Sequence, residues 1–126
     1  MNDAALPAAP ATADAPPPFC LEIEDGGEPA VVLCRGRLTS RYTDLLYSHV
    51  SPLLGSHKRV ILDLSELSHM DSLGLGTLVR LYVASMSKGS SLELKNLGQK
   101  VRDLLILTNL LPTFTILGER NIRMGP

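Results

Sequence analysis

Residues 60–82 read VILDLSELSHMDSLGLGTLVRLY, two apolar runs separated by a short polar interval. The first run, Arg59–Leu64, is short and rich in branched side chains, which predicts a buried central strand. The second, Leu75–Met86, has apolar residues at helical spacing and is followed by a lysine and a glycine suited to a helix end. A strand, a polar turn and a helix in this order form the basic unit of an α/β fold.

The rest of the chain supplies further strands and helices on both sides of this unit. The predicted strands are Phe19–Glu24, Ala30–Arg35, Arg59–Leu64, Leu92–Lys95 and Phe114–Leu117, and the predicted helices cover residues 45–54, 75–86 and 101–111. Asp25-Gly26-Gly27 is expected to close a hairpin, Ser40 to cap the first helix, Gly55 to end it, and Asn109 to cap the third. We therefore predict one α/β domain, a mostly parallel or mixed sheet of about five strands with three to four helices.

Composition narrows the classes of function. The Ala/Pro-rich residues 1–18 have no periodic apolar face, which is typical of a disordered tail, so we assign the domain to residues 19–126. No apolar run reaches the roughly 20 residues that span a bilayer, and Met1-Asn2-Asp3 begins no cationic signal peptide, so we expect a cytoplasmic protein without membrane insertion. A net charge of −1 and 4% aromatic residues argue against nucleic-acid binding. Cys20 and Cys34 lie in predicted strands, and we expect reduced thiols.

The polar interval HMDSLGLG, residues 69–76, fits none of three common site motifs. No Gly-Lys-Ser/Thr completes a P-loop, no third glycine completes a dinucleotide loop, and Met70 stands where a nucleophile elbow needs glycine. Either Asp71 or Ser72 could cap the following helix. His49, His57 and His69 are the only histidines that could serve a nucleophilic serine, and no cluster with metal-ligand spacing occurs. A serine at a helix N-terminus is well placed to carry or meet a phosphate.

Three segments of the sequence resemble the STAS domain of bacterial anti-sigma factor antagonists. They are VILDLSELSHMDSLGLGTLVRLY, LELKNLG and VRDLLILTNLL, and the similarity runs from about Phe19 to Leu117. The most specific part is Met70-Asp71-Ser72-x-Gly74-Leu75-Gly76 between strand and helix. Thr108-Asn109-Leu110 stands where the family commonly has Thr-Gly-Leu.

The resemblance implies a bacterial, non-catalytic regulator of transcription that works by switching partners. Members of this branch bind a cognate anti-sigma serine kinase when unphosphorylated and thereby release a sigma factor; the kinase phosphorylates the serine that corresponds to Ser72, and a metal-dependent serine phosphatase reverses the modification. The resemblance implies no cofactor, no metal and no direct contact with nucleic acid, in a monomer or weak dimer. The residues expected to meet the partner are Asp71, Ser72, Leu73, Gly74 and Leu75, together with Thr39, Ser40 and Arg41 in the turn after the second strand.

Some positions depart from the family pattern and keep an alternative open. Leu73 follows Ser72 where a second hydroxyl is common, and Thr39 and Arg37 stand where acidic residues are common. The alternative is a STAS subunit that is not phosphorylated and belongs to a lipid-transport ABC system or a sensory scaffold.

Overall fold

The computed structural model describes residues 19–117, which form one mixed sheet with helices. The strands are β2 (Cys20–Glu24), β3 (Ala30–Leu38), β4 (Arg59–Met70), β5 (Ser91–Lys95) and β6 (Thr115–Leu117), adjacent in this order in the sheet. The α-helices are α1 (Thr43–Ser56), α2 (Ser72–Lys88) and α3 (Gln99–Leu107), with short 3-10 turns η3 (Ser40–Tyr42) and η4 (Leu111–Thr113). The pairing of β2 with β3 is antiparallel and the other pairs are parallel, which confirms the predicted α/β class. The predictions for the tail of residues 1–18 and for the end of the domain after Leu117 lie outside the described residues.

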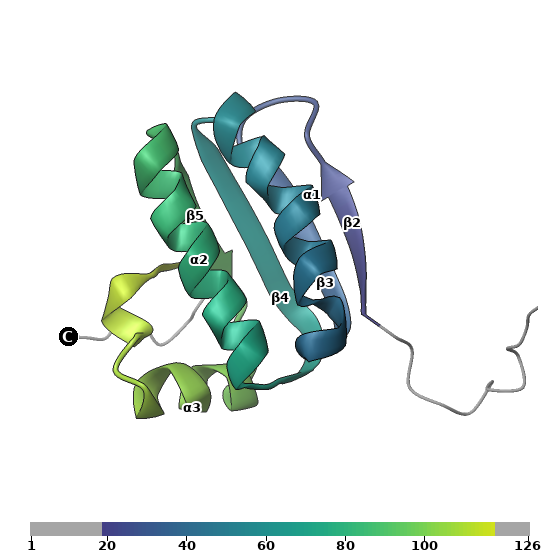
Figure 1. Ribbon diagram of the computed structural model, residues 1–126, viewed down its shortest axis with the longest axis vertical. Helices are drawn as coiled ribbons and strands as arrows, with labels where there is room; N and C mark the ends of the chain where they lie inside the picture. Colours follow the sequence, from purple (N-terminus) through teal and green to yellow (C-terminus); the bar gives the residue numbers. More distant parts are fainter. Residues whose placement is uncertain (1–18, 118–126) are drawn as a thin grey trace, which may run out of the picture.

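Helices α1 and α2 lie side by side on one face of the sheet (Figure 1). Alternate residues of the central strands point to this face and are almost fully buried, as the period of a strand requires. They pack against one buried stripe from each helix. The core formed in this way includes Ala30, Val32, Cys34, Val60, Leu62, Leu64, Leu92 and Leu94 from the sheet and Leu46, Val50, Leu78 and Leu81 from the helices.

The buried stripe of α2 differs from the predicted one. Leu81 is fully buried, whereas Met86, predicted to share a face with Leu75 and Leu78, is 64% exposed. The helix is apolar on most sides, so its sequence contains two overlapping apolar stripes. Only the position of the sheet decides between them.

The central strand β4 is longer than the predicted Arg59–Leu64, because it continues to Met70. Its register against β3 slips twice, so that Leu33 pairs with Asp63 but Leu38 pairs with Met70. Such bulges insert extra residues into one strand without ending it. The exposed pair Ser65 and Glu66 interrupts the apolar pattern at this point, which explains why the prediction stopped early.

Two of the predicted helix caps agree with the structure, and two predicted helix ends differ from it. Gly89 and Asn109 have positive φ angles of 71° and 61°, as expected for αL caps, and α1 ends at Ser56, one residue past Gly55. The prediction that Ser40 caps the first helix is wrong. Ser40 begins η3, and the residue at the N-cap of α1 is Tyr42, which makes no side-chain cap hydrogen bond.

The two cysteines lie on opposite faces of the β2–β3 hairpin. Leu21 pairs with Cys34 and Cys20 pairs with Arg35, so Cys20 is exposed while Cys34 faces the core. Both thiols are free, and burial raises the pKa of Cys34 to about 12.

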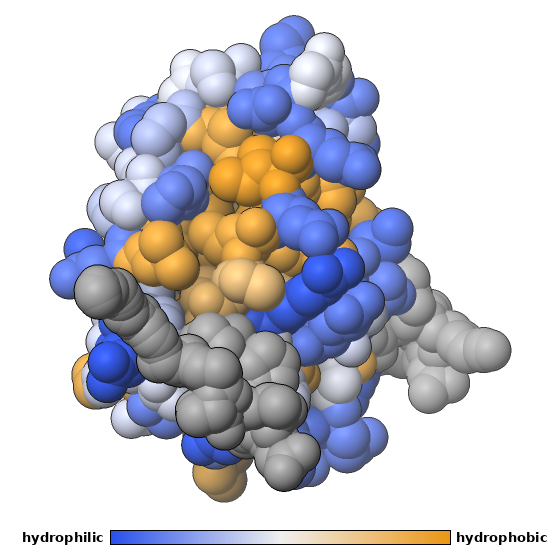
Figure 2. All heavy atoms as spheres, turned by 90° about the vertical axis from the view of Figure 1, so that its right-hand side faces the viewer, coloured by the Kyte–Doolittle hydropathy of each residue, from blue (hydrophilic) through white to orange (hydrophobic). Residues whose placement is uncertain are grey.

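Figure 2 views the molecule from the side of β2 and shows apolar residues gathered over this edge of the sheet.

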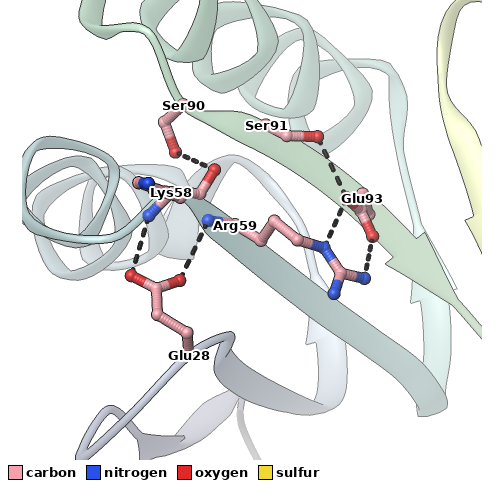
Figure 3. Close-up of polar contacts among 6 residues, drawn as sticks. All are labelled: Glu28, Lys58, Arg59, Ser90, Ser91 and Glu93. Carbon is pink, nitrogen blue, oxygen red and sulfur yellow. Dashed lines mark hydrogen bonds and ion pairs between the residues drawn. The ribbon is translucent and has the colours of Figure 1, made fainter.

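A group of polar contacts fixes the N-terminal end of β4 (Figure 3). Glu28, in the β2–β3 loop, accepts hydrogen bonds from the backbone N–H groups of Lys58 and Arg59 at 2.9 and 3.3 Å. On the sheet face opposite α1 and α2, Arg59 donates two hydrogen bonds to the Glu93 carboxylate, at 3.0 and 2.7 Å. Glu93 is only 7% exposed, and these hydrogen bonds lower the pKa of its carboxyl group. The contact therefore ties β4 to β5.

Arg59→Ala should lower the free energy of unfolding at neutral pH, because it removes the two hydrogen bonds that Arg59 donates to the largely buried Glu93 carboxylate. The pKa of Glu93 is lower in the folded protein than in the unfolded chain. The ion pair therefore stabilises the fold above the ordinary carboxyl pKa, and this effect is lost as the pH falls through the folded value. Urea unfolding at neutral and acidic pH should thus show the variant and wild type converging in acid. Lys95→Ala, on the same face of β5, is the control and should change stability by less than about 0.5 kcal/mol.

Candidate functional site

Strands β3 and β4 end side by side, and this brings the two predicted site segments together. Leu38 pairs with Met70, and the backbone N–H of Asp71 donates to the carbonyl oxygen of Leu38 at 3.2 Å. The turn η3 therefore contacts α2 at the C-terminal edge of the sheet. Thr39, Ser40 and Arg41 lie in one region of the surface with the residues that open α2. In open α/β sheets this edge is where ligands and partners usually bind.

Asp71 caps helix α2, which decides between the two candidates that the sequence left open. Its backbone is extended, with φ −99° and ψ −177°, and its side chain accepts a hydrogen bond from the Gly74 N–H at 2.9 Å. Ser72 is the first helical residue and is exposed. Within residues 19–117 its hydroxyl has no hydrogen-bond partner, so the cap does not depend on it.

The two glycines of the junction differ in surroundings. A Cβ atom added to Gly74 would lie 2.6 Å from the carbonyl oxygen of Leu38 and 2.9 Å from side-chain atoms of Leu38 and Met70. Gly74 thus allows the first turn of α2 to pack against the end of β3. Gly76 is exposed, and a Cβ there would meet nothing within 4 Å. Packing therefore requires glycine at position 74 but not at position 76.

Burial divides the predicted contact residues into two groups. Gly74 and Leu75, two of the residues predicted to bind the partner, are buried and hold the first turn of α2 against the sheet, so they contribute little to the exposed surface of the site. Ser72, Ser40 and Arg41 are exposed, Asp71 and Thr39 are half-buried, and Leu73 is 58% exposed. A large apolar side chain beside a free hydroxyl is suited to contact with another protein.

The sequence did not single out Gly76 as part of this surface. It follows Leu73 by three residues, so the two lie on the same side of the helix. A glycine inside a helix costs stability, and its position at helical spacing from Leu73 is a signal that sequence inspection could have used. That no side chain packs against Gly76 is known only from the structure.

Other site chemistries find no support in the described part of the chain. Residues 19–117 contain no group of three or more His, Cys, Asp or Glu side chains that could hold a metal ion. His69 is half-buried at the end of β4, and no hydrogen bond joins it to Ser72. None of the described helices is long and apolar enough to cross a membrane.

The fold and this strand-end site define a small α/β domain with a capped helix start at its exposed edge. The family model described as "Mlab, STAS domain" matches residues 21–112. The chain therefore belongs to the STAS domain family.

Solved structures share this fold. The anti-sigma factor antagonist SpoIIAA from Bacillus is known in an unphosphorylated and a phosphorylated form, and both are 19% identical to this chain. The unphosphorylated form superimposes with a TM-score of 0.67, and the match covers 79% of this chain and 90% of that one. The phosphorylated form gives 0.63, with 79% and 93% covered. An anti-sigma factor antagonist from Mycobacterium paratuberculosis gives a TM-score of 0.72 at 20% identity, covering 82% of this chain and 88% of that one. A sulfate transporter family protein from Wolinella succinogenes gives 0.61 at 14% identity, covering 71% and 76%. At these identities the likeness concerns the fold, which several functions share.

Proposed function

We propose that this protein is an anti-sigma factor antagonist that binds a cognate anti-sigma serine kinase and is switched off by phosphorylation at Ser72. The observation that carries the proposal is the exposed Ser72 hydroxyl, which has no hydrogen-bond partner in the described chain while the neighbouring Asp71 caps the helix. A kinase can modify such a hydroxyl without breaking the fold. SpoIIAA, a structural neighbour, occurs in unphosphorylated and phosphorylated forms, and this supports the same behaviour here.

A phosphate on Ser72 would change the surface much more than the fold. Phosphorylation adds about −1.5 to −2 charges at neutral pH. At the first position of α2 this charge lies near the positive end of the helix dipole, which favours it. A partner that covers the exposed Leu73 would, however, have to remove water from the same charge. The modified protein is therefore expected to stay folded and to lose its partner.

The kinase would dock on Ser72 and Leu73 from α2 and on Thr39, Ser40 and Arg41 from the turn after β3. A metal-dependent serine phosphatase would restore the binding form. In this role the protein acts in the cytoplasm, together with its partner. It has no enzymatic activity of its own and makes no direct contact with nucleic acid. A monomer or weak dimer suffices for this role.

Incubation with radiolabelled ATP and the cognate kinase should label the wild-type protein stoichiometrically, and Ser72→Ala should abolish the label. Ser65→Ala is the control, because Ser65 is an exposed serine of β4 outside the proposed docking surface and should leave labelling unchanged. Peptide mass spectrometry locates the phosphate. An unlabelled wild type under a kinase that phosphorylates another substrate would exclude the phosphorylation step.

A second function is favoured by two observations. The matching family model carries Mlab in its description, and Leu73 replaces the second hydroxyl common after the phosphorylated serine. We propose as the alternative a STAS subunit of a lipid-transport ABC system or a sensory scaffold, docking through the same surface without phosphorylation. Copurification with a transporter ATPase that is unaffected by Ser72→Ala would favour this alternative.

A further inference from the structure

Helix α2 exposes a continuous line of residues that begins at the candidate site. Leu73, Gly76, Arg80 and Val83 follow one another at intervals of three or four residues, so they share one side of the helix. All four are exposed, and Leu73 and Val83 are each 58% exposed although apolar. The line spans about 15 Å at the rise of an α-helix. The candidate site therefore continues without interruption along α2.

The far end of this line forms one wall of an open groove between α1 and α2. The groove has a volume of about 520 Å³, and its lining includes Tyr47 from α1 and Val79 and Val83 from α2. Figure 1 shows the two helices side by side over the sheet, so the groove runs along their common outer surface. Tyr47, Val79, Val83 and Ala84 give the groove an apolar lining, which suits contact with the apolar face of another helix.

The charges of the groove have a single sign. Arg80 lies over the ring of Tyr47, 4.2 Å from its centroid, and the Lys88 ammonium donates to the carbonyl oxygen and the hydroxyl of Ser51 at 3.0 and 3.2 Å. These contacts hold both cations at the groove but leave their charges without a carboxylate among the lining residues. A partner surface with carboxylates would therefore complement the groove.

The Ser72 end alone offers few accessible side chains. A specific protein–protein interface usually buries about 800 Å² on each partner, contributed by roughly 20 residues or more. The line on α2 and its groove supply the additional area in direct continuity with Leu73. The absence of a side chain at Gly76 lets a partner backbone come close to α2 one turn after Leu73.

We propose that the partner of the proposed function also docks along α2, placing an acidic, amphipathic helix in the groove between α1 and α2. Its apolar residues pack on Val79 and Val83, and its carboxylates face Arg80 and Lys88. This inference rests on the proposed function, because it concerns the same partner. It adds a second contact region that does not depend on the phosphorylation state.

The test uses the full chain and the partner that it retains from native cytosol, identified by mass spectrometry and purified. Arg80→Glu should weaken binding about tenfold or more, because it reverses the charge that faces the partner's carboxylates. Lys100→Glu, a charge reversal at another exposed residue, on α3, is the matched control and should change the dissociation constant less than about threefold. Thermal melting of both variants shows whether the fold is retained.

Photocrosslinking identifies which partner segment occupies the groove. p-Benzoylphenylalanine at Val83 should crosslink to an acidic helical peptide of the partner, and the same probe at Ile106, an exposed apolar residue of α3, should not. Two results would show that the groove is not the docking site while the proposed function stands. In the first, Leu73→Asp abolishes binding, but Arg80→Glu has no more effect than Lys100→Glu. In the second, the probe at position 106 crosslinks to the partner and the probe at position 83 does not. If Leu73→Asp has no effect on binding, the proposed function and this extension both fail.

Discussion

Gly74→Ala should lower the free energy of unfolding by about 3 kcal/mol, at the upper end of the cost of overpacking a core. The added Cβ would lie 2.6 Å from a backbone carbonyl oxygen, that of Leu38, and no rotamer change can move this atom. Relief would require α2 to move away from the end of β3, which would disturb the pairing of Leu38 with Met70 and the hydrogen bond between Leu38 and Asp71. Urea unfolding followed by circular dichroism measures the loss.

Gly76→Ala is the matched control, two residues further along the same helix. Apart from the adjoining backbone of its own helix, nothing lies within 4 Å of the Cβ it introduces. Alanine is also the better helix former, so stability should rise by about 0.5–1 kcal/mol. Opposite signs for the two variants are the expected result. Equal losses would mean that glycine acts at both positions through the helix backbone and that the contact with Leu38 carries no particular cost.

The contrast between these glycines shows how far sequence reasoning reaches. The spacing of apolar residues predicted the strands, the helices and their order, because alternation and helical periodicity are local properties. Whether a glycine is required depends on what approaches it. For Gly74 this is Leu38, which belongs to another strand and reaches it only through the two register slips between β3 and β4. Periodicity contains no information about such slips.

The sequence predicted which residues form the candidate site, but not which of them caps the helix and which remains accessible. Asp71 and Ser72 are both good capping residues, and their backbone angles decide that Asp71 caps while Ser72 is free. The sequence also did not show which residues of the site are exposed to solvent. Leu73 and Leu75 look alike in the sequence, but one is 58% exposed and the other 5%, because only Leu75 turns toward the sheet.

Ser72→Asp should weaken partner binding by roughly 30-fold or more, which corresponds to about 2 kcal/mol for a charge that the interface takes out of water. The residue lies beside the exposed Leu73, so a partner that covers this leucine also removes water from the new carboxylate. Phosphoserine carries about twice the charge of aspartate and should act more strongly. Isothermal titration calorimetry with the purified partner measures the change.

Ser72→Asn separates charge from size, since asparagine has nearly the shape of aspartate and no charge. It should weaken binding much less than Ser72→Asp, and Ser72→Ala should bind about as well as the wild type. Both charged and neutral variants should unfold at similar urea concentrations, because Asp71 keeps the cap and a negative charge at the first turn of α2 is favourable. Equal affinities for the Asp and Asn variants would show that the partner senses bulk at this position, and the phosphate would then act by its volume and not by its charge.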